Sequence, residues 1–257
     1  MKQSQGMAFF FALALLLCSA MPVGAFEIGA RALYWFPTFK ADIRVDDSGL
    51  TGDNLNLKDT LGVKDESFPS FEVFVGHGGH HLNVAYTPID YSGSTLLTRK
   101  IVFNGQTFAA GSKVDTNLQL KMFDLGYQYD LIDTENILAG FSLGLIVQIK
   151  YIDGEAKINA PAYNTGSDFK FRAPMPMLGL GAHVGILHDI LEARVKATGI
   201  AYSGSYFYEA LADLSFTPFP FLDIHAGYKM MRLKIDYSDL LLNTEFAGPF
   251  VGLTVSF

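Results

Sequence analysis

The chain has 257 residues with a formal net charge of −7, and it has no basic stripe, so nucleic acid is not an expected partner. Hydrophobic residues make up 49% of the sequence and charged residues only 18%, an apolar balance that is high for a secreted soluble domain. After the N-terminal segment no run approaches the roughly 18 consecutive apolar residues of a spanning helix, which argues against a helical membrane protein.

Residues 1–25 have the features of a cleaved secretory signal peptide. Lys2 precedes an uninterrupted apolar run from Met7 to Cys18, and small residues lead to Ala25, so we expect cleavage before Phe26. The alternative is a lipoprotein signal with Cys18 as the lipidated residue. Leu17 argues against it, because lipoprotein signals prefer a small residue there. We therefore treat residues 26–257 as one domain without cysteine, and hence without disulfide or thiol chemistry.

Long runs of alternating apolar and polar residues follow along the mature chain. In "ILEARVKATGIAY", from Ile190, the two kinds of residue occupy opposite faces, as in a strand with one apolar side. A soluble β-sandwich alternates too, but its strands have about five or six residues, whereas a tilted strand that crosses a bilayer needs about 9 to 11. We expect ten such strands, at residues 27–39, 67–77, 80–92, 113–129, 137–153, 169–187, 190–203, 205–217, 221–236 and 248–257.

The connections between these strands alternate in length. Short turns are expected at residues 76–80, 130–136, 188–189 and 217–221, and longer polar stretches at 42–66, 93–113, 154–168 and 237–247, with a tight turn at Gly204 as the exception. Short periplasmic turns and long external loops are typical of outer-membrane barrels. The sequence therefore predicts an all-β fold, a closed antiparallel up-and-down transmembrane β-barrel of ten strands with both termini periplasmic.

Eight or twelve strands are the alternatives to ten. The twelve-strand form requires "LLTRKIVFNGQTF", residues 96–108, to cross the membrane. Its Asn104-Gly105 pair is a hairpin signal, and we expect this segment to stand above the membrane on the second long loop.

Two runs change phase at a proline. Apolar residues hold even positions from Ile28 to Phe36 and odd positions from Phe39 to Val45, with Pro37 between them, and a similar change occurs at Pro88. Because proline cannot donate to the strand ladder, either a β-bulge or the exit from the membrane would explain the change. Aromatic residues gather near the expected strand ends, which indicates interfacial girdles.

The chain ends on the apolar alternation "GPFVGLTVSF", residues 248–257. With the signal peptide and the alternating strands, the final "GLTVSF" resembles the bacterial outer-membrane β-barrel superfamily, broadly its OmpA-like and OmpW-like small barrels. The resemblance implies a Gram-negative outer membrane, contact with its lipids and lipopolysaccharide, and an assembly signal read by the outer-membrane barrel assembly machinery. Gly252, Val255 and Phe257 match that signal; Phe250 stands where a polar residue is commoner and Val255 where an aromatic is.

The last strand is also expected to close the barrel. We predict that it pairs with the first strand near residues 28–36, because an open edge in a bilayer would leave backbone groups unsatisfied. The side chains expected to face lipid are Val251, Leu253, Val255 and Phe257.

Ten strands enclose only a narrow lumen. The candidate lumen-lining residues are mixed in sign: Lys121, Lys150, Glu192, Arg194, Lys196, Asp223, His225 and Lys229. Such residues would either line a small polar channel or pair with one another and close it. We expect a non-enzymatic, narrow porin-like channel for small solutes or ions, with a closed structural or surface-recognition barrel as the alternative.

An outer-membrane protease or lipid A modifying enzyme is a weaker hypothesis. Such barrels use His with Asp, Ser or Glu near the outer leaflet, whereas all six histidines here fall at or near the expected periplasmic end. The "HGGHH" stretch from His77 to His81 is a poor metal site, because its imidazoles diverge on a tight turn that contains no carboxylate. No catalytic residue, metal or cofactor is expected.

The first long loop is acidic. Its "DDSGLTGDN", residues 46–54, lacks the spacing of an EF-hand and is expected to be solvated. The following "LNLKDTLGV", residues 55–63, is expected to form a short helix that caps the barrel mouth or dips into it. The sequence indicates neither a transported solute nor an oligomeric state.

Overall fold

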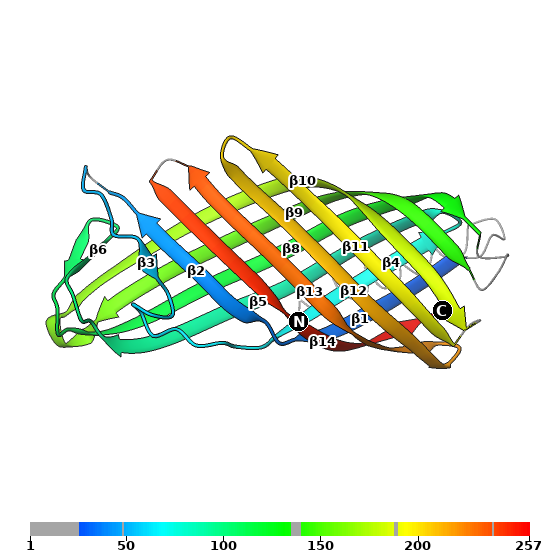
Figure 1. The fold of residues 1–257 in the computed structure, drawn as a ribbon, viewed down its shortest axis with the longest axis horizontal. Coiled ribbons are helices and arrows are strands. Elements are labelled where there is room, and N and C mark those ends of the chain that lie inside the picture. The colour runs from blue at the N-terminus through cyan, green and yellow to red at the C-terminus, as the bar shows by residue number, and fades with distance from the viewer. Residues whose placement is uncertain (1–25, 48, 135–139, 188–189, 238) are drawn as a thin grey trace, which may run out of the picture.

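The computed structural model of the chain describes residues 26–257 apart from 48, 135–139, 188–189 and 238, so the expected signal peptide lies outside the described residues. Ten strands form one closed antiparallel wall (Figure 1). In order around it they are β1 (Phe26–Trp35), β4 (Phe68–His77), β5 (His80–Leu96), β8 (Lys113–Asp133), β9 (Phe141–Ala160), β10 (Thr165–Leu187), β11 (Leu191–Tyr202), β12 (Ser205–Phe219), β13 (Leu222–Tyr237) and β14 (Leu240–Ser256). The predicted ten-strand barrel is confirmed, and the alternatives of eight or twelve strands are wrong.

The last strand closes the barrel on the first. Trp35 of β1 lies opposite Phe250 of β14, and Gly29 opposite Ser256. Beyond them, Phe257 donates its N–H to the carbonyl of Ile28 at 2.9 Å and accepts the N–H of Ile28 at 3.0 Å. We call the end of the barrel that carries Phe26 and Phe257 the terminal end, and the opposite end the distal end.

The strands begin and end close to where the sequence predicts, except at the distal end. Most of residues 154–168 and 237–247, expected as long loops, belong to the wall. Strand β9 runs to Ala160 and β10 starts at Thr165, after the short 3₁₀ helix η1 (Pro161–Tyr163), while β13 ends at Tyr237 and β14 starts at Leu240. The physical reason is that the alternation continues there with its apolar side inward, so these residues bury Ile158, Ala160 and Leu242 inside the barrel. In the described ranges no helix is long and apolar enough to cross a membrane, a finding that does not bear on spanning strands.

The segment around Asn104-Gly105 stays outside the wall, as predicted. Strands β6 (Ile101–Phe103) and β7 (Gln106–Phe108) form a separate two-stranded sheet. Its turn residues have φ angles of 46° at Asn104 and 71° at Gly105, the left-handed geometry that Asn-Gly accommodates in a type I′ hairpin.

The acidic first loop folds into the distal mouth. Strand β3 (Leu55–Asn56) pairs with β2 (Thr38–Val45), and the following residues make turns with only two hydrogen bonds of helical spacing, from Thr60 to Asn56 and from Gly62 to Lys58. The expected helix is therefore reduced to turns. The expectation that this segment dips into the mouth is confirmed, because its Leu57, Leu61 and Val63 are buried in the common apolar core.

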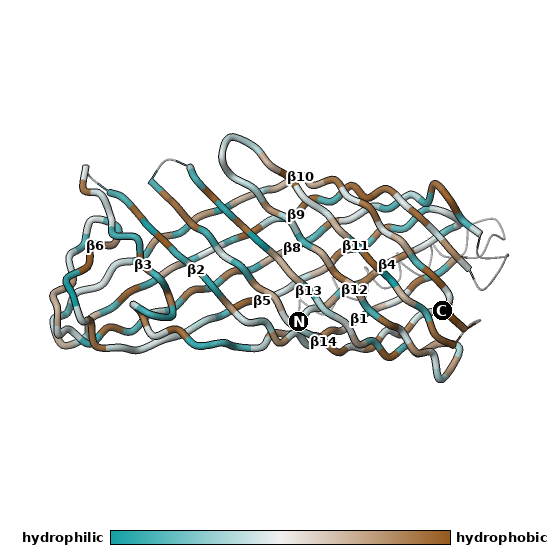
Figure 2. The backbone as a smooth tube through the Cα atoms, viewed as in Figure 1, coloured by the Kyte–Doolittle hydropathy of each residue, from teal (hydrophilic) through white to brown (hydrophobic). Residues whose placement is uncertain are grey.

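The side of the wall that carries the apolar residues changes partway along the barrel. Figure 2 shows the apolar and polar residues that alternate along the strands. In the terminal half apolar side chains point outward, as with Val73 and Leu125, whereas in the distal half they point inward, as with Leu118 and Leu120. The backbone does not slip at this level: Trp35 pairs with Phe250 and, beyond Pro37, Thr38 pairs with Ala247 in the same register. A continuous register also passes Pro88 on β5.

The interpretation of the two phase changes as β-bulges is therefore wrong. The other interpretation is that the strands leave apolar surroundings near Pro37 and Pro88. Beyond this level the outer wall carries rows of charges set by the register. Lys121, Asp153 and Arg172 lie opposite one another on β8, β9 and β10, and a second row consists of Arg232, Glu245 and Lys40.

The distal half of the lumen is filled with side chains. We call Trp35, Phe39, Phe68, Tyr91 and Phe246 the aromatic cluster. The ring of Tyr91 stacks on Phe39 at 4.1 Å between centroids and meets Phe68 edge-on at 5.0 Å. Inward residues from strands around the barrel join the cluster in one contiguous core, among them Met122, Ile152, Met177, Phe207, Met231 and Phe250. This apolar layer separates the distal mouth from the terminal half of the lumen.

Candidate functional site: a polar cavity in the barrel lumen

Below the aromatic cluster the lumen contains a cavity of about 790 Å³. Its lining extends from the turn at Thr217–Pro220, at the terminal end, up to Lys229, whose Nζ lies 5.3 Å from the ring centroid of Trp35. The walls are mostly polar and charged because the outward side of the same strands is apolar, and strict alternation then leaves the polar residues inside.

Six of the candidate lumen-lining residues border this cavity: Glu192, Arg194, Lys196, Asp223, His225 and Lys229. Lys150 is buried, with its side chain only 1% exposed, and forms ion pairs with two carboxylates that line the cavity. Lys121 is a correction: it is exposed on the outer wall, between the buried Leu120 and Met122. The prediction took the polar side of this strand as inward, but at Lys121 the wall has already inverted.

Two lysines and two carboxylates form the first charged network, which we call the lysine network. Nζ of Lys150 lies 2.6 Å from Asp124 and 3.1 Å from Glu209, and Nζ of Lys229 lies 3.3 Å from the other oxygen of Glu209. Gln148 adds a hydrogen bond to Asp124 at 2.7 Å. Because β8, β9, β12 and β13 all contribute, the network ties opposite parts of the wall together.

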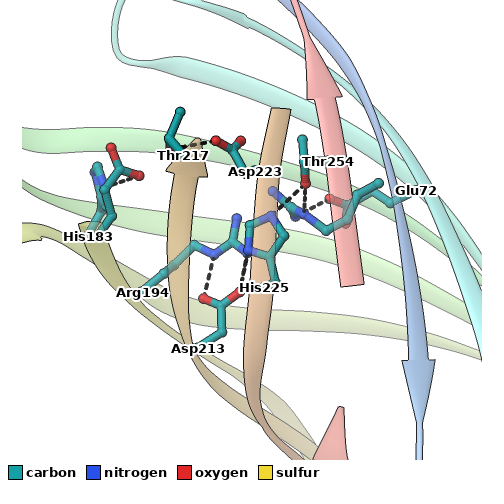
Figure 3. Close-up of polar contacts among 10 residues, drawn as sticks. Glu72, His183, Arg194, Asp213, Thr217, Asp223, His225 and Thr254 are labelled. Atoms are coloured by element: carbon teal, nitrogen blue, oxygen red, sulfur yellow. Dashed lines mark hydrogen bonds and ion pairs between the residues drawn. The ribbon is translucent and has the colours of Figure 1, made fainter. Parts of the chain in front are cut away.

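Asp213 organises a second network, which we call the arginine network (Figure 3). Its carboxylate accepts two hydrogen bonds from the Arg194 guanidinium, at 3.2 and 2.6 Å, and lies 3.2 Å from Nδ1 of His225. Nε2 of His225 is 2.7 Å from the Thr254 hydroxyl, to which Arg31 also donates at 2.9 Å. Arg31 in turn pairs with Glu72 at 2.6 Å, so the chain of contacts spans β11, β12, β13, β14, β1 and β4.

Toward the terminal end the lining is acidic. His183 pairs with Glu192 at 3.0 Å and His81 with Asp130 at 2.8 Å, while Asp223 accepts a hydrogen bond from Thr217 at 2.7 Å. Glu27 also borders the cavity at this level. Entry to the cavity from the terminal end therefore passes carboxylates.

Sequence reasoning missed the carboxylates that partner the predicted cations. Glu209 and Asp213 stand at inward positions of β12, where they interrupt a run of Phe, Leu and Ala, and that interruption was a usable signal. Asp124 was missed for a different reason. The prediction that Lys121 faces the lumen assigns the even-numbered residues of β8 to the outside, and Asp124 is one of them.

The described histidines all belong to the terminal half of the barrel. His77 and His80 lie opposite each other across the Gly78-Gly79 turn, and Nδ1 of His80 is 2.6 Å from the Tyr127 hydroxyl. His81 turns instead to Asp130, which lies on β8, outside the "HGGHH" stretch. His188 lies outside the described residues. Among the residues that the structure covers, no group of three or more His, Cys, Asp or Glu could hold a metal ion.

No protein-family model matches the chain, and no curated protein matches it significantly. Solved structures do match. The outer membrane protease OmpT of Escherichia coli superimposes with a TM-score of 0.59 at 13% identity, over 91% of this chain and 98% of that one. The chain has the fold of an outer-membrane β-barrel.

Two further solved structures match with lower TM-scores. The translocator domain of the autotransporter NalP from Neisseria meningitidis gives a TM-score of 0.43 at 10% identity, over 99% of this chain and 97% of that one. Neisserial surface protein A gives 0.36 at 15% identity, over 90% and 97%.

Proposed function

We propose that this barrel is an integral protein of the bacterial outer membrane, with its terminal half in the bilayer, both chain ends at the periplasm and its distal half outside the cell. The outward apolar side chains of the terminal half support this position, because water would not favour so many of them exposed together. The charged rows of the distal half also support this position, because Arg172 and Asp153 on the outer wall would be costly in hydrocarbon.

The same position gives the proposed partners. Outer-membrane lipids and lipopolysaccharide would surround the wall, and the barrel assembly machinery would read Gly252, Val255 and Phe257. Val255 is outward and Phe257 is 79% exposed, so both are accessible to a partner at the terminal end.

Within the membrane we infer a closed, non-enzymatic barrel that acts as a structural or surface-recognition protein. The observation that carries this proposal is the apolar layer across the lumen, in which Phe39, Tyr91 and Val114 are 0% exposed. An ion that crossed this layer would lose its hydration without finding polar partners, which costs several kcal/mol or more. The two charged networks beneath it are paired internally, as expected of a lumen filled by side chains.

A narrow channel remains the second candidate, and one observation favours it. The cavity of about 790 Å³ already forms a polar path through the terminal half of the lumen, so a channel would require displacement only of the apolar residues that fill the distal half. The likeness to OmpT concerns the fold and does not argue for catalysis. Among the described histidines none stands at the distal end, where a surface enzyme of this kind would need its general base.

Planar-bilayer recording of the refolded protein tests the closed barrel. We expect no conductance above that of protein-free bilayers. A variant with Phe39→Ala, Tyr91→Ala and Phe246→Ala is the comparison, because it removes three large rings from the layer and should conduct more than the unmodified protein. Steady conductance of the unmodified protein would refute the closed barrel and support the channel.

A further inference from the structure

We propose that the cavity binds a short-chain aliphatic monocarboxylate against Lys196. The proposal concerns binding from the terminal end and does not depend on whether the lumen conducts.

Most basic side chains of the cavity already have a carboxylate partner. Five basic side chains border the cavity or pair with its lining: Arg31, Lys150, Arg194, Lys196 and Lys229. Four of them are held by carboxylates, as the Arg31–Glu72, Lys150–Asp124, Arg194–Asp213 and Lys229–Glu209 pairs show. Glu209 is shared with Lys150, so all four carboxylates are engaged. Lys196 makes no ion pair and no hydrogen bond with any residue in the described part of the chain.

The register explains why Lys196 has no partner. Arg194, one inward position below it on β11, lies directly opposite Asp213 of β12. Lys196 lies opposite Leu211 on β12 and opposite Gly181 on β10, so no carboxylate lies directly across from it. The inward carboxylates on either side of Leu211 are engaged elsewhere: Glu209 pairs with Lys150 and Lys229, and Asp213 pairs with Arg194. The next inward residue of β11, Thr198, carries a buried hydroxyl that also lacks a hydrogen-bond partner. Two adjacent donors of the same strand thus face the cavity side of the wall without an acceptor.

An unpaired ammonium group in a partly enclosed site is costly, and a carboxylate would relieve that cost through a charge-assisted hydrogen bond. Lys196 is the one member of these five basic side chains that has no described carboxylate at ion-pair distance, so a single negative charge would supply its missing partner. Multivalent anions are disfavoured, because Glu192, Asp223 and the other carboxylates near the terminal end repel them on entry.

The remaining lining sets the rest of the ligand. Leu33, Ile146 and Leu211 border the cavity among its polar groups, and Leu211 lies directly opposite Lys196. A short hydrocarbon tail would cover these side chains once the carboxylate pairs with Lys196. The volume of the cavity is within the usual range of small-ligand sites, about 300 to 1,000 Å³, and leaves room for water beside such a ligand.

The test is titration of ¹³C-labelled butyrate into the refolded full-length barrel in detergent micelles, followed by NMR. Lys196→Gln should weaken saturable binding at least about tenfold, because it removes the cation. Lys121→Gln is the matched control, since it removes a lysine from the outer wall and should leave binding unchanged. Lys196→Arg keeps the charge and should retain binding, and malonate should compete more weakly than unlabelled butyrate.

Two results would overturn the proposal: absence of saturable butyrate binding to the unmodified protein, or equal binding by the Lys196→Gln variant. Heat-modifiable migration on unboiled gels verifies that each variant has folded. If Lys196→Gln does not fold, the comparison of butyrate with n-butanol on the unmodified protein decides instead, because butanol has the tail without the charge. Equal binding of the two would then refute the pairing with Lys196. Bilayer conductance is measured separately, so failure of the closed-barrel proposal would not be mistaken for failure of this one.

Discussion

Removal of the Asp213 carboxylate should destabilise the barrel strongly. The Asp213 side chain is fully buried, holds Arg194 by two hydrogen bonds and contacts His225. Asp213→Ala would leave the guanidinium of Arg194 in a partly enclosed lumen without its counter-charge. Removing one member of a buried pair typically costs about 3 to 5 kcal/mol in the free energy of unfolding. We expect a loss in that range.

Urea unfolding of the barrel refolded into lipid vesicles measures this loss. Trp35 is the only tryptophan of the chain and lies in the aromatic cluster, so its fluorescence reports on the lumen. Asp153→Ala is the matched control, because its exposed pair with Arg172 spans 3.6 Å on the outer wall and should contribute less than about 1 kcal/mol.

A double variant separates the lost pair from other damage. If the unpaired guanidinium of Arg194 causes the loss of stability, the double variant Asp213→Ala with Arg194→Met should be less destabilised than Asp213→Ala alone. In the double variant this cation is absent and is not left unpaired. The reasoning would be refuted if Asp213→Ala lay within about 1 kcal/mol of the unmodified protein. A double variant less stable than either single variant would refute the charge explanation as well.

Three further predictions concern the outer wall and the chain end. Deletion of Phe257 should impair insertion by the assembly machinery more than it lowers the stability of the protein that has inserted. Insertion is measured as the fraction of heat-modifiable barrel in cells, and normal insertion would contradict the assembly role. Leu125→Lys, in the outward apolar region, should cost about 2 to 4 kcal/mol on vesicle unfolding, and an unchanged stability would place this residue outside the bilayer. Hydrogen bonds from Lys157 and Lys170 lower the pKa of the half-buried Glu155. The small stability that Glu155 adds is therefore present above its unfolded pKa and is lost as the pH falls through the folded value. Glu155→Gln should abolish that part of the acid dependence in urea titrations, and an identical pH profile would contradict this explanation.

The wall of the barrel was predictable because its signal is local. Alternation over ten or more residues identifies a strand without knowledge of its neighbours, and the hairpin at Asn104-Gly105 follows from two residues. The distal strand ends were misjudged at residues 154–168 because a polar outward face with small inward residues resembles a loop. In the structure those small residues, such as Ala156 and Ala160, are inward wall positions.

The contents of the lumen were only partly predictable. Arg194 and Lys196 can be assigned to the inside from the alternation of β11 alone. Whether each one has an ion-pair partner depends on the residue opposite it on the neighbouring strand. Asp213 opposes Arg194 and Leu211 opposes Lys196, a distinction that arises from the register of β12. The sequence of one strand does not determine its register with the next strand. A shift of one residue in that register would place different residues opposite Arg194 and Lys196.

The inversion of polarity along the wall also sets how deeply the barrel can sit. In the proposed orientation, a barrel that sank toward the periplasm would bring Lys121 and Asp153 into hydrocarbon, and a barrel that rose would expose Val73 and Leu125 to water. Both displacements raise the free energy, so the protein has a preferred immersion depth that its own outer surface defines. A bilayer of different thickness would have to adapt to this barrel, by thinning or thickening around it, rather than shift the barrel along the membrane normal.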